Sequence, residues 1–179
     1  MAPKFAKKSS QILLSLSSIA SIRHTLPMTE NSRVMPKKRV GAGVAIVDEN
    51  LRILLVEPTY KDSWEVPGGM VELNEGPREA ARRECREELG LDISVERLLV
   101  IDWVSEGRTP GEGLMFIYAT GPVETSQIIL PSEELRSWEW CDHEAVMARV
   151  PNHKARRLFA AINALRDGTF IELENGNLP

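Results

Sequence analysis

The sequence has few of the features that mark several large classes of protein. Its 179 residues include only two cysteines, Cys85 and Cys141, which provide neither a disulfide framework nor a paired-cysteine metal site. No apolar run approaches the ~18 residues that a membrane-spanning helix needs. Because cysteine is scarce and no spanning segment is found, we expect a protein of the reducing cytoplasm with no membrane partner.

Basic residues are also too few for a surface that captures long nucleic acid. The chain has 22 Lys and Arg against 26 Asp and Glu, a formal net charge of −4. Residues 1–27 carry +4, which leaves −8 for residues 28–179. Long nucleic acid is held by positive patches that contact its phosphates, so this class of partner is not expected. Small phosphorylated ligands that bind together with metal ions are compatible with such an acidic chain.

The composition that remains is that of one globular domain, with 42% hydrophobic and 27% charged residues. We expect residues 1–36 to form a disordered N-terminal extension, residues 37–174 the folded domain and residues 175–179 a tail. Residues 1–27 are compatible with a targeting peptide, a disordered tail or an extension upstream of a start at Met28 or Met35. Their apolar part is short and interrupted by serines, which favours the last two interpretations.

Short apolar runs separated by turn residues predict a domain of strands and helices. Residues 40–47 predict a strand buried on both faces, which turns at 48–50 and returns at 52–56 as the second arm of a hairpin. Residues 64–66 predict a short strand that stops at Pro67. Further strands are expected at 98–104, 114–118, 127–130, 135–141 and 169–173, and further helices at 142–149 and 151–165.

The helix that follows Gly76 is the best-signalled element. Pro77 stands near the first helical position, where its missing N–H costs nothing, and Gly90 provides the C-terminal stop. Between them an apolar stripe recurs at every fourth residue, formed by Ala81, Cys85 and Leu89. This pattern predicts a helix whose apolar stripe packs against the core.

Three carboxylates of this helix lie on the face that adjoins the stripe: Glu84, Glu87 and Glu88. Acids three or four residues apart on a helix face one another and repel. Such a cluster therefore calls for a compensating cation, and donors that are all oxygen favour a hard divalent ion such as Mg²⁺. The competing interpretation is a solvated face that pairs with the neighbouring arginines.

The wider pattern resembles a known family. Gly69, Glu75 after five residues, and Arg83-Glu84-Cys85-Arg86-Glu87-Glu88-Leu89-Gly90-Leu91 after seven more are similar to the Nudix box, G-x5-E-x7-R-E-U-x-E-E-x-G-U. The lead-in Trp64-Glu65-Val66-Pro67-Gly68-Gly69 is also typical of that family. The one departure is Cys85, where a bulky aliphatic residue is expected, and a buried thiol can pack as a small hydrophobe. The resemblance implies an α/β (α+β) fold, the Nudix-type α/β/α sandwich with a mixed β-sheet between helices.

The resemblance also implies a reaction, a cofactor and a set of roles. It implies Mg²⁺- or Mn²⁺-dependent hydrolysis of a small nucleoside diphosphate linked to another moiety, X, to a nucleoside monophosphate and phosphorylated X. The metal ligands would be Glu84, Glu87 and Glu88 with a backbone carbonyl of Gly68 or Gly69. Arg83 would orient a metal-binding glutamate and Glu75 would support the turn between loop and helix.

Residues outside the metal cluster complete the predicted site. Glu87 is the first choice for the general base and Glu112, on a loop, is the second. Glu72 is a candidate contact for an additional metal ion. The predicted substrate-binding residues are Tyr60, Trp103 and Arg108, against the alternative that Trp103 is a core residue of its strand.

Three other functions are compatible with the same fold. One is a ligand sensor without turnover, which would not need three adjoining carboxylates. Another is a hydrolase of nucleic-acid 5′ ends, which the acidic charge disfavours. The third is an isomerase of an isoprenoid diphosphate, for which the sequence offers no separate pairing of cysteine and glutamate. The sequence leaves open the identity of X and of the nucleoside base, and which carboxylate is the general base. The oligomeric state, including a homodimer, is also left open.

Overall fold

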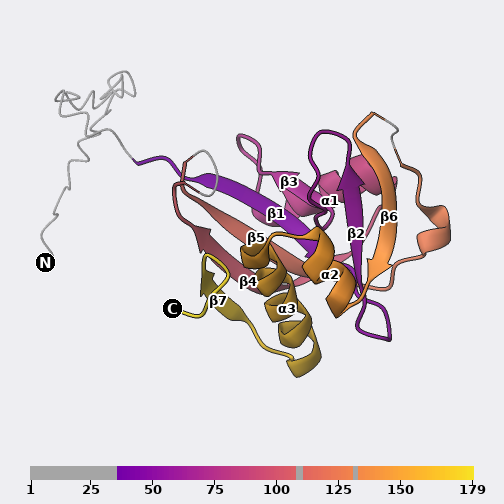
Figure 1. Cartoon of the computed structure of the whole chain (residues 1–179). Coiled ribbons are helices and arrows are strands. Elements are labelled where there is room, and N and C mark those ends of the chain that lie inside the picture. The colour runs from indigo at the N-terminus through magenta and orange to yellow at the C-terminus, as the bar shows by residue number, and fades with distance from the viewer. Residues whose placement is uncertain (1–35, 108–110, 131–132) are drawn as a thin grey trace, which may run out of the picture. The chain divides into compact units, whose positions relative to one another are not determined.

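The computed structural model describes residues 36–107, 111–130 and 133–179 (Figure 1). In this part of the chain the elements follow one another as β1 (Arg39–Ala45), β2 (Ile53–Pro58), β3 (Gly68–Met70), α1 (Pro77–Leu89), β4 (Val95–Val104), β5 (Gly113–Thr120), the 3₁₀ turn η1 (Thr125–Gln127), β6 (Leu135–Cys141), α2 (His143–Arg149), α3 (Asn152–Asp167) and β7 (Ile171–Glu174).

The strands form a mixed five-stranded sheet and a separate two-stranded sheet. The larger sheet has the order β3-β1-β5-β4-β7, with β1 parallel to β5 and β4 parallel to β7. The pairs β1–β3 and β4–β5 are antiparallel. The smaller sheet is the antiparallel pair β2–β6. This arrangement confirms the predicted mixed sheet.

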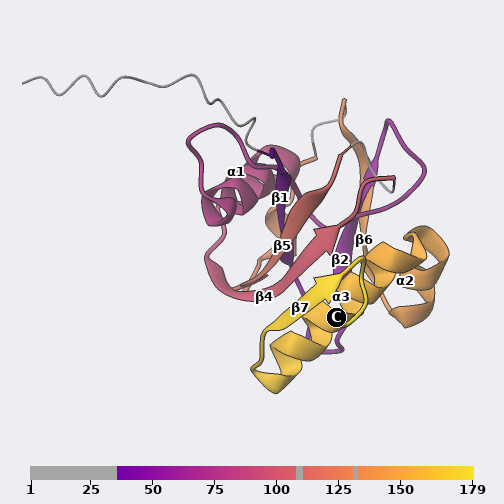
Figure 2. The ribbon, with the colours of Figure 1, turned by 90° about the vertical axis from the view of Figure 1, so that its left-hand side faces the viewer.

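Two apolar cores cover opposite sides of the strands. On one side, α1 buries Ala81, Cys85 and Leu89 against residues such as Val44 of β1. On the other side, α2 and α3 contribute to a second cluster, which also contains buried side chains of β2, β4 and β5. Figure 2 shows α1 and α3 on the two sides with the strands between them. The sandwich expected from the sequence is therefore present.

The predicted hairpin of 40–47 and 52–56 forms only at its turn. Asp48 and Arg52 close that turn, and the antiparallel bridge between Val47 and Ile53 continues it for one step. Beyond this bridge the arms separate, because β1 pairs with β3 and β5 while β2 pairs with β6. The chain therefore passes from one sheet to the other here.

Two short predicted strands were misplaced. Strand β3 begins at Gly68, after the predicted 64–66, because the two glycines lie close enough to β1 to pair with Ala42 and Gly43. Only Glu65 of the predicted segment bridges another strand, at Val56. Residues 127–130 form no strand either: η1 ends at Gln127 and the chain then continues in extended conformation without a ladder.

Helix α1 begins and ends where the sequence predicts. Gly76 is its N-cap, Pro77 is the first helical residue, and Gly90 closes the helix in the left-handed conformation with φ of 70°. The N–H of Gly90 donates to the carbonyl of Arg86, and the N–H of Leu91 donates to that of Cys85. These local signals fix the position at which the acidic face of α1 starts and stops.

The segment after β7 is bonded to the domain. The backbone N–H of Gly176 donates to Oδ1 of Asp102 at 3.1 Å, and the amide of Asn175 contacts Ser105. Asp102 is fully buried in β4 and its other oxygen accepts from Nε of Arg157 at 2.7 Å. The predicted tail 175–179 thus begins with residues that close the edge of the core. None of the described helices is long and apolar enough to span a bilayer.

Candidate functional site

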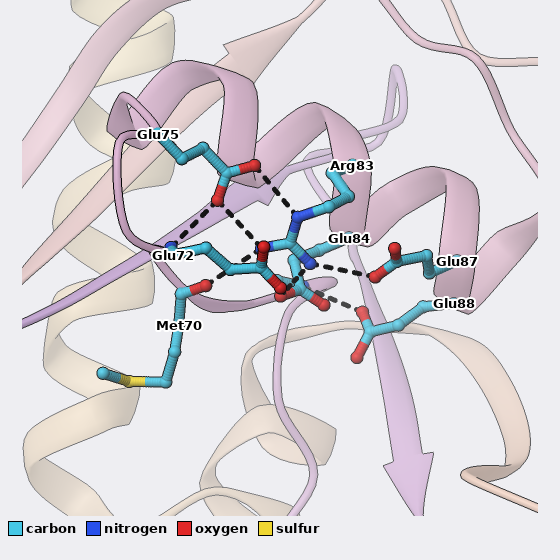
Figure 3. A network of polar contacts seen from close by, with 8 residues as sticks. Met70, Glu72, Glu75, Arg83, Glu84, Glu87 and Glu88 are labelled. Atoms are coloured by element: carbon cyan, nitrogen blue, oxygen red, sulfur yellow. Dashed lines mark hydrogen bonds and ion pairs between the residues drawn. The ribbon is translucent and has the colours of Figure 1, made fainter.

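Arg83 is the centre of a polar network on the exposed side of α1. Its Nε and Nη2 donate to the two oxygens of Glu75 at 2.9 and 3.0 Å. Its Nη1 donates to Oε1 of Glu84 at 2.8 Å and to Oε2 of Glu87 at 2.9 Å. Figure 3 shows these carboxylates around one guanidinium. The fork geometry of arginine allows this, and the three carboxylates raise the pKa of Arg83 further, led by the hydrogen bonds to Glu75.

The same arginine ties the helix to the preceding loop. Its Nη2 also donates to the carbonyl of Met70 at 3.0 Å, at the end of β3. Glu75 accepts from the backbone N–H of Glu72 at 3.0 Å, and the hydrogen bond from Arg83 lowers the pKa of Glu75. The loop between β3 and α1 is therefore held at both ends by one carboxylate–guanidinium pair, the supporting geometry predicted for Glu75.

Gly69 brings the backbone of β3 against the carboxylate of Glu84. A Cβ atom built at Gly69 would lie 2.3 Å from Oε1 of Glu84, far inside contact distance. Burial raises the pKa of Glu84, and the hydrogen bond from Arg83 only opposes this rise. A carboxylate with its ionised form disfavoured in this way is a good partner for a further cation.

Glu88 is the most buried acid of the cluster. Its Oε2 accepts from the backbone N–H of Gly68 at 2.9 Å. Burial raises the pKa of Glu88 to about 8, and the negative charge of Glu84 adds to the rise. Glu88 is therefore short of positive charge, whereas Glu84 and Glu87 are both bonded to Arg83 and Glu87 is 55% exposed.

The donor chemistry of this group fits a hard divalent cation. All the side-chain donors are carboxylate oxygens, and Arg83 occupies Oε1 of Glu84 and Oε2 of Glu87, which leaves the other oxygen of each for a metal. Among the residues that the structure describes, no three His, Cys, Asp or Glu side chains are already grouped as a metal site. Glu84, Glu87 and Glu88 stay the predicted ligands, and metal binding would need their carboxylates to come together.

A cavity of about 320 Å³ opens beside β3. Its floor includes Gly68 and Gly69, the two residues that contact Glu88 and Glu84. Its walls come from β1, β5, the loop after β2 and the first turns of α3, and most of them are apolar, such as Val66, Met115 and Leu158. A cavity of this size, mainly apolar with a few polar groups, suits a small-molecule ligand.

The structure brings some of the predicted substrate residues to this cavity and not others. Tyr60 lines it with a side chain that is largely exposed. Trp103 is half-buried in β4, where it pairs with Leu114 and Glu174, and is not among the lining residues. Arg108 lies outside the described residues. Its role remains a prediction.

The two additional carboxylates predicted from the sequence have different surroundings. Glu112 pairs with Lys38, whose hydrogen bond lowers the pKa of Glu112, and among the described residues it contacts none of the α1 carboxylates. Glu72 lies beside Glu75 and Arg83 in the network of Figure 3. Glu72 is thus close to the predicted metal site, and Glu112 as it stands is not part of it.

The cationic wall of the cavity was not foreseen. Lys154 and Arg157 of α3 line it together with Lys61 from the loop after β2. They lie far from Gly69 in the sequence and follow no pattern of their own. Only the packing of α3 beside β1 and β5 brings them to the same cavity as Gly68 and Gly69, so local sequence signals could not have identified them.

Comparison with known proteins agrees with this fold. A model of the NUDIX domain family matches residues 37–161, most of the chain. A MutT-like protein of Streptomyces ambofaciens is 30% identical over 130 residues, which cover 72% of this chain and 79% of that protein. An RNA pyrophosphohydrolase of Hydrogenovibrio crunogenus is 36% identical over 69 residues, 37% of this chain and 42% of that protein. The match to the second relative therefore spans less than half of its length.

A solved structure shares the fold at lower identity. The structure of a UDP-X diphosphatase superposes with a TM-score of 0.63 at 20% identity, covering 77% of this chain and 68% of that one. At such identity the likeness supports the architecture and carries no information on substrate. It agrees with the mixed sheet between helices described above.

Proposed function

Because the chain belongs to the Nudix family of hydrolases, we propose that it is a Mg²⁺- or Mn²⁺-dependent pyrophosphohydrolase of small nucleotides. It hydrolyses a nucleoside diphosphate linked to a moiety X to a nucleoside monophosphate and phosphorylated X. The observation that carries the proposal is the network in which Arg83 joins Glu75, Glu84 and Glu87, near a cavity whose size suits a small molecule.

The carboxylates of α1 would hold the metal at the edge of that cavity. Glu84, Glu87 and Glu88 supply oxygen ligands, and the carbonyl of Gly69 lies on the strand that contacts Glu84. When bound, a divalent ion neutralises diphosphate oxygens and lowers the pKa of a coordinated water. Glu88 is half-buried and forms no ion pair with the residues that the structure describes, which is consistent with this role.

The reaction itself transfers a phosphoryl or nucleotidyl group to water. The water oxygen forms a bond to one phosphorus of the diphosphate, and the bond from that phosphorus to the bridging oxygen breaks. The bridging oxygen leaves with the electron pair on the second phosphate, and the proton of the water passes to a carboxylate. Catalysis then depends mainly on positioning and charge stabilisation.

Arg83 and Glu75 serve this reaction through the carboxylates that they position. The two-pronged contact of Arg83 with Glu75 fixes the guanidinium, and the guanidinium in turn fixes one oxygen each of Glu84 and Glu87. The free oxygens of both glutamates are thereby directed away from the arginine. Such supporting pairs typically contribute 10- to 100-fold in metal affinity or rate.

Glu87 is our first choice for the general base. It is 55% exposed, so water reaches it, and Arg83 holds only one of its oxygens. Glu112 is the second choice, and it would need to leave Lys38 and approach α1 when substrate binds. The exposed position and the shared arginine favour Glu87.

The test is a panel of nucleotides with Mg²⁺, including nucleotide sugars, dinucleoside polyphosphates, ADP-ribose, NADH and nucleoside triphosphates. We expect release of a monophosphate from at least one member. Glu87→Gln should lower that rate by orders of magnitude while the melting temperature stays close to that of the wild type. Glu79→Gln, on the same helix but outside the arginine network, is the matched control and should retain activity.

Two results would contradict the proposal. If no member of the panel is hydrolysed while one binds tightly, the chain is a sensor with a Nudix fold. If only RNA carrying a 5′-triphosphate is cleaved, the substrate is a nucleic-acid end and not a small nucleotide. Product analysis by chromatography separates these outcomes from the expected one.

A further inference from the structure

Three cations that line the cavity share two carboxylates, Glu65 and Asp102. Lys61 forms an ion pair with Glu65 at 2.5 Å, and the ammonium of Lys154 lies 3.8 Å from the other oxygen of the same carboxylate. The single carboxylate of Glu65 is thus the ion-pair partner of both lysines. Arg157 stands one helical turn after Lys154, and the positive charges of Lys61 and Arg157 both act on Lys154.

Arg157 is anchored in a way that leaves part of its guanidinium toward the cavity. Its side chain is only 6% exposed, and Nε donates to the fully buried Asp102 at 2.7 Å. Among the described residues, neither terminal nitrogen of Arg157 donates a hydrogen bond. Every buried side-chain nitrogen or oxygen of these residues has a hydrogen-bond partner, so the two terminal nitrogens are not fully buried. Because Arg157 lines the cavity, we place these terminal nitrogens at its surface.

The start of α3 adds to the positive potential of the same wall. This 16-residue helix begins at Asn152 without a side-chain cap and without an acidic residue in its first turn. Lys154 itself stands in that turn, where a cation opposes the helix dipole. Burial lowers the pKa of Lys154, and the neighbouring charges of Lys61 and Arg157 act in the same direction. An anion bound here would interact favourably with the uncapped N-terminus of α3 and with the positive charge of Lys154.

The position of these cations relative to the predicted metal ligands of α1 indicates which kind of anion they bind. The same cavity is lined by Gly68 and Gly69, beside the predicted metal ligands, and by Lys61, Lys154 and Arg157. Glu65, which pairs with Lys61 and Lys154, lies close enough to Glu88 for its negative charge to act on that carboxylate. A ligand with one phosphate at the carboxylates has room to place another at the cations.

We propose that Lys61, Lys154 and Arg157 form a phosphate subsite, which selects substrates whose X moiety carries a phosphate beyond the diphosphate that is cleaved. This inference rests on the proposed function and names its substrate class: nucleoside triphosphates and dinucleoside polyphosphates over nucleotide sugars. Lys154 is the specificity-determining residue, since the charges of both other cations act on it and it lies farther from Glu65 than Lys61 does. Arg157 supplies a planar donor fork suited to phosphate oxygens.

The first experiment measures binding alone. Tripolyphosphate is titrated calorimetrically into the wild type and Lys154→Gln in the presence of a chelator, so that no metal takes part. We expect binding to the wild type and a loss of about 10- to 100-fold in Lys154→Gln, the range of a charge-assisted hydrogen bond. Lys154→Arg should retain most of the affinity. Lys37→Gln, which removes the same charge at an exposed position outside the cavity, is the matched control.

The second experiment measures selectivity. A nucleoside triphosphate and a nucleotide sugar with the same base, such as UTP and UDP-glucose, are compared with Mg²⁺. Lys154→Gln should lower kcat/KM about 10- to 100-fold for the triphosphate, mainly through KM, and change the nucleotide sugar by less than threefold. Removing a crowded lysine should leave the melting temperature unchanged or higher, which excludes misfolding as the cause.

The outcomes separate this inference from the proposed function. Equal tripolyphosphate affinity in the wild type and Lys154→Gln, or equal losses on both substrates, overturns the phosphate subsite even if the protein is an active hydrolase. Absence of turnover on every nucleotide overturns the proposed function, while the calorimetric result still decides whether the subsite exists.

Discussion

Replacing Gly69 by alanine tests whether the close approach of β3 to α1 serves the site. The added Cβ would lie 2.3, 2.5 and 2.9 Å from Oε1, Cδ and Oε2 of Glu84. Ordinary contact begins near 3.4 Å, so the carboxylate must move by about 1 Å. The backbone at Gly69 is not in the left-handed region, so the clash with the side chain is the only strain. The substitution should therefore displace Glu84 and leave the strand in place.

The expected effects on stability and function differ widely. Moving Glu84 weakens its 2.8 Å hydrogen bond from Arg83, a half-buried charge-assisted contact that contributes about 1 kcal/mol. The melting temperature should fall by only about 3 °C in a domain of this size. A misplacement of about 1 Å at a reacting centre costs about 100-fold in rate, and altered ligand geometry costs 10- to 100-fold in metal affinity.

Gly68→Ala provides the contrast at the neighbouring position. Gly68 has φ of 152°, and an added Cβ would lie 2.4 Å from the backbone oxygen of Ala42 and 2.5 Å from Cα of Gly43. Backbone atoms cannot move aside as a carboxylate can, so β3 must separate from β1. We expect a loss of more than about 3 kcal/mol in the free energy of unfolding, with activity lost through unfolding.

The assays are thermal unfolding, calorimetric Mg²⁺ titration and kcat/KM on the best nucleotide of the panel. The reasoning predicts a folded, weakly active Gly69→Ala protein and an unstable Gly68→Ala protein. If Gly69→Ala binds Mg²⁺ and turns over substrate as the wild type does, then the contact between Gly69 and Glu84 has no part in the site.

Three further outcomes follow from buried or bridging groups. Arg83→Lys keeps the charge but loses the fork that joins several carboxylates, so kcat/KM should fall about 10- to 100-fold in steady-state assays. Asp102→Asn leaves Arg157 without its buried counter-charge and should cost about 3–5 kcal/mol in urea unfolding. Burial raises the pKa of the Cys85 and Cys141 thiols, so neither should react with Ellman's reagent at pH 8 until the protein is unfolded.

Each of these expectations has a result that would oppose it. Full activity in Arg83→Lys would show that charge alone orders the glutamates. Unchanged urea stability in Asp102→Asn would show that Arg157 finds another acceptor. The double replacement Asp102→Leu and Arg157→Met should recover stability relative to Asp102→Asn, because it removes both buried charges together. Rapid labelling of one thiol in the folded protein would show that its side of the core opens readily.

Local signals determined the part of this protein that carries the predicted metal ligands. Proline at the first position and glycine at the end set the limits of α1, and a four-residue apolar period set its buried face. Both depend only on contacts within a few residues, so the carboxylate face could be placed from the sequence. The mixed sheet between helices was also expected, through the resemblance of that segment to the Nudix box.

Tertiary packing decided what local signals could not. Gly68 and Gly69 resemble a strand stop, yet they form β3 because their lack of side chains lets them approach β1 and Glu84. The turn at Asp48 resembles a hairpin, yet its arms enter different sheets because β6, far along the chain, pairs with β2. Strand partners are chosen by contacts between distant segments, which a local pattern does not encode.

The cavity is the clearest case of this division. The carboxylates on one side of it were read from 23 consecutive residues, Gly69 to Leu91. The cations on the other side come from α3 and from the loop after β2, and they become neighbours only when α3 packs on the opposite core. The chemistry proposed for the chain thus follows from a short segment, whereas its selectivity follows from how distant elements meet around one cavity.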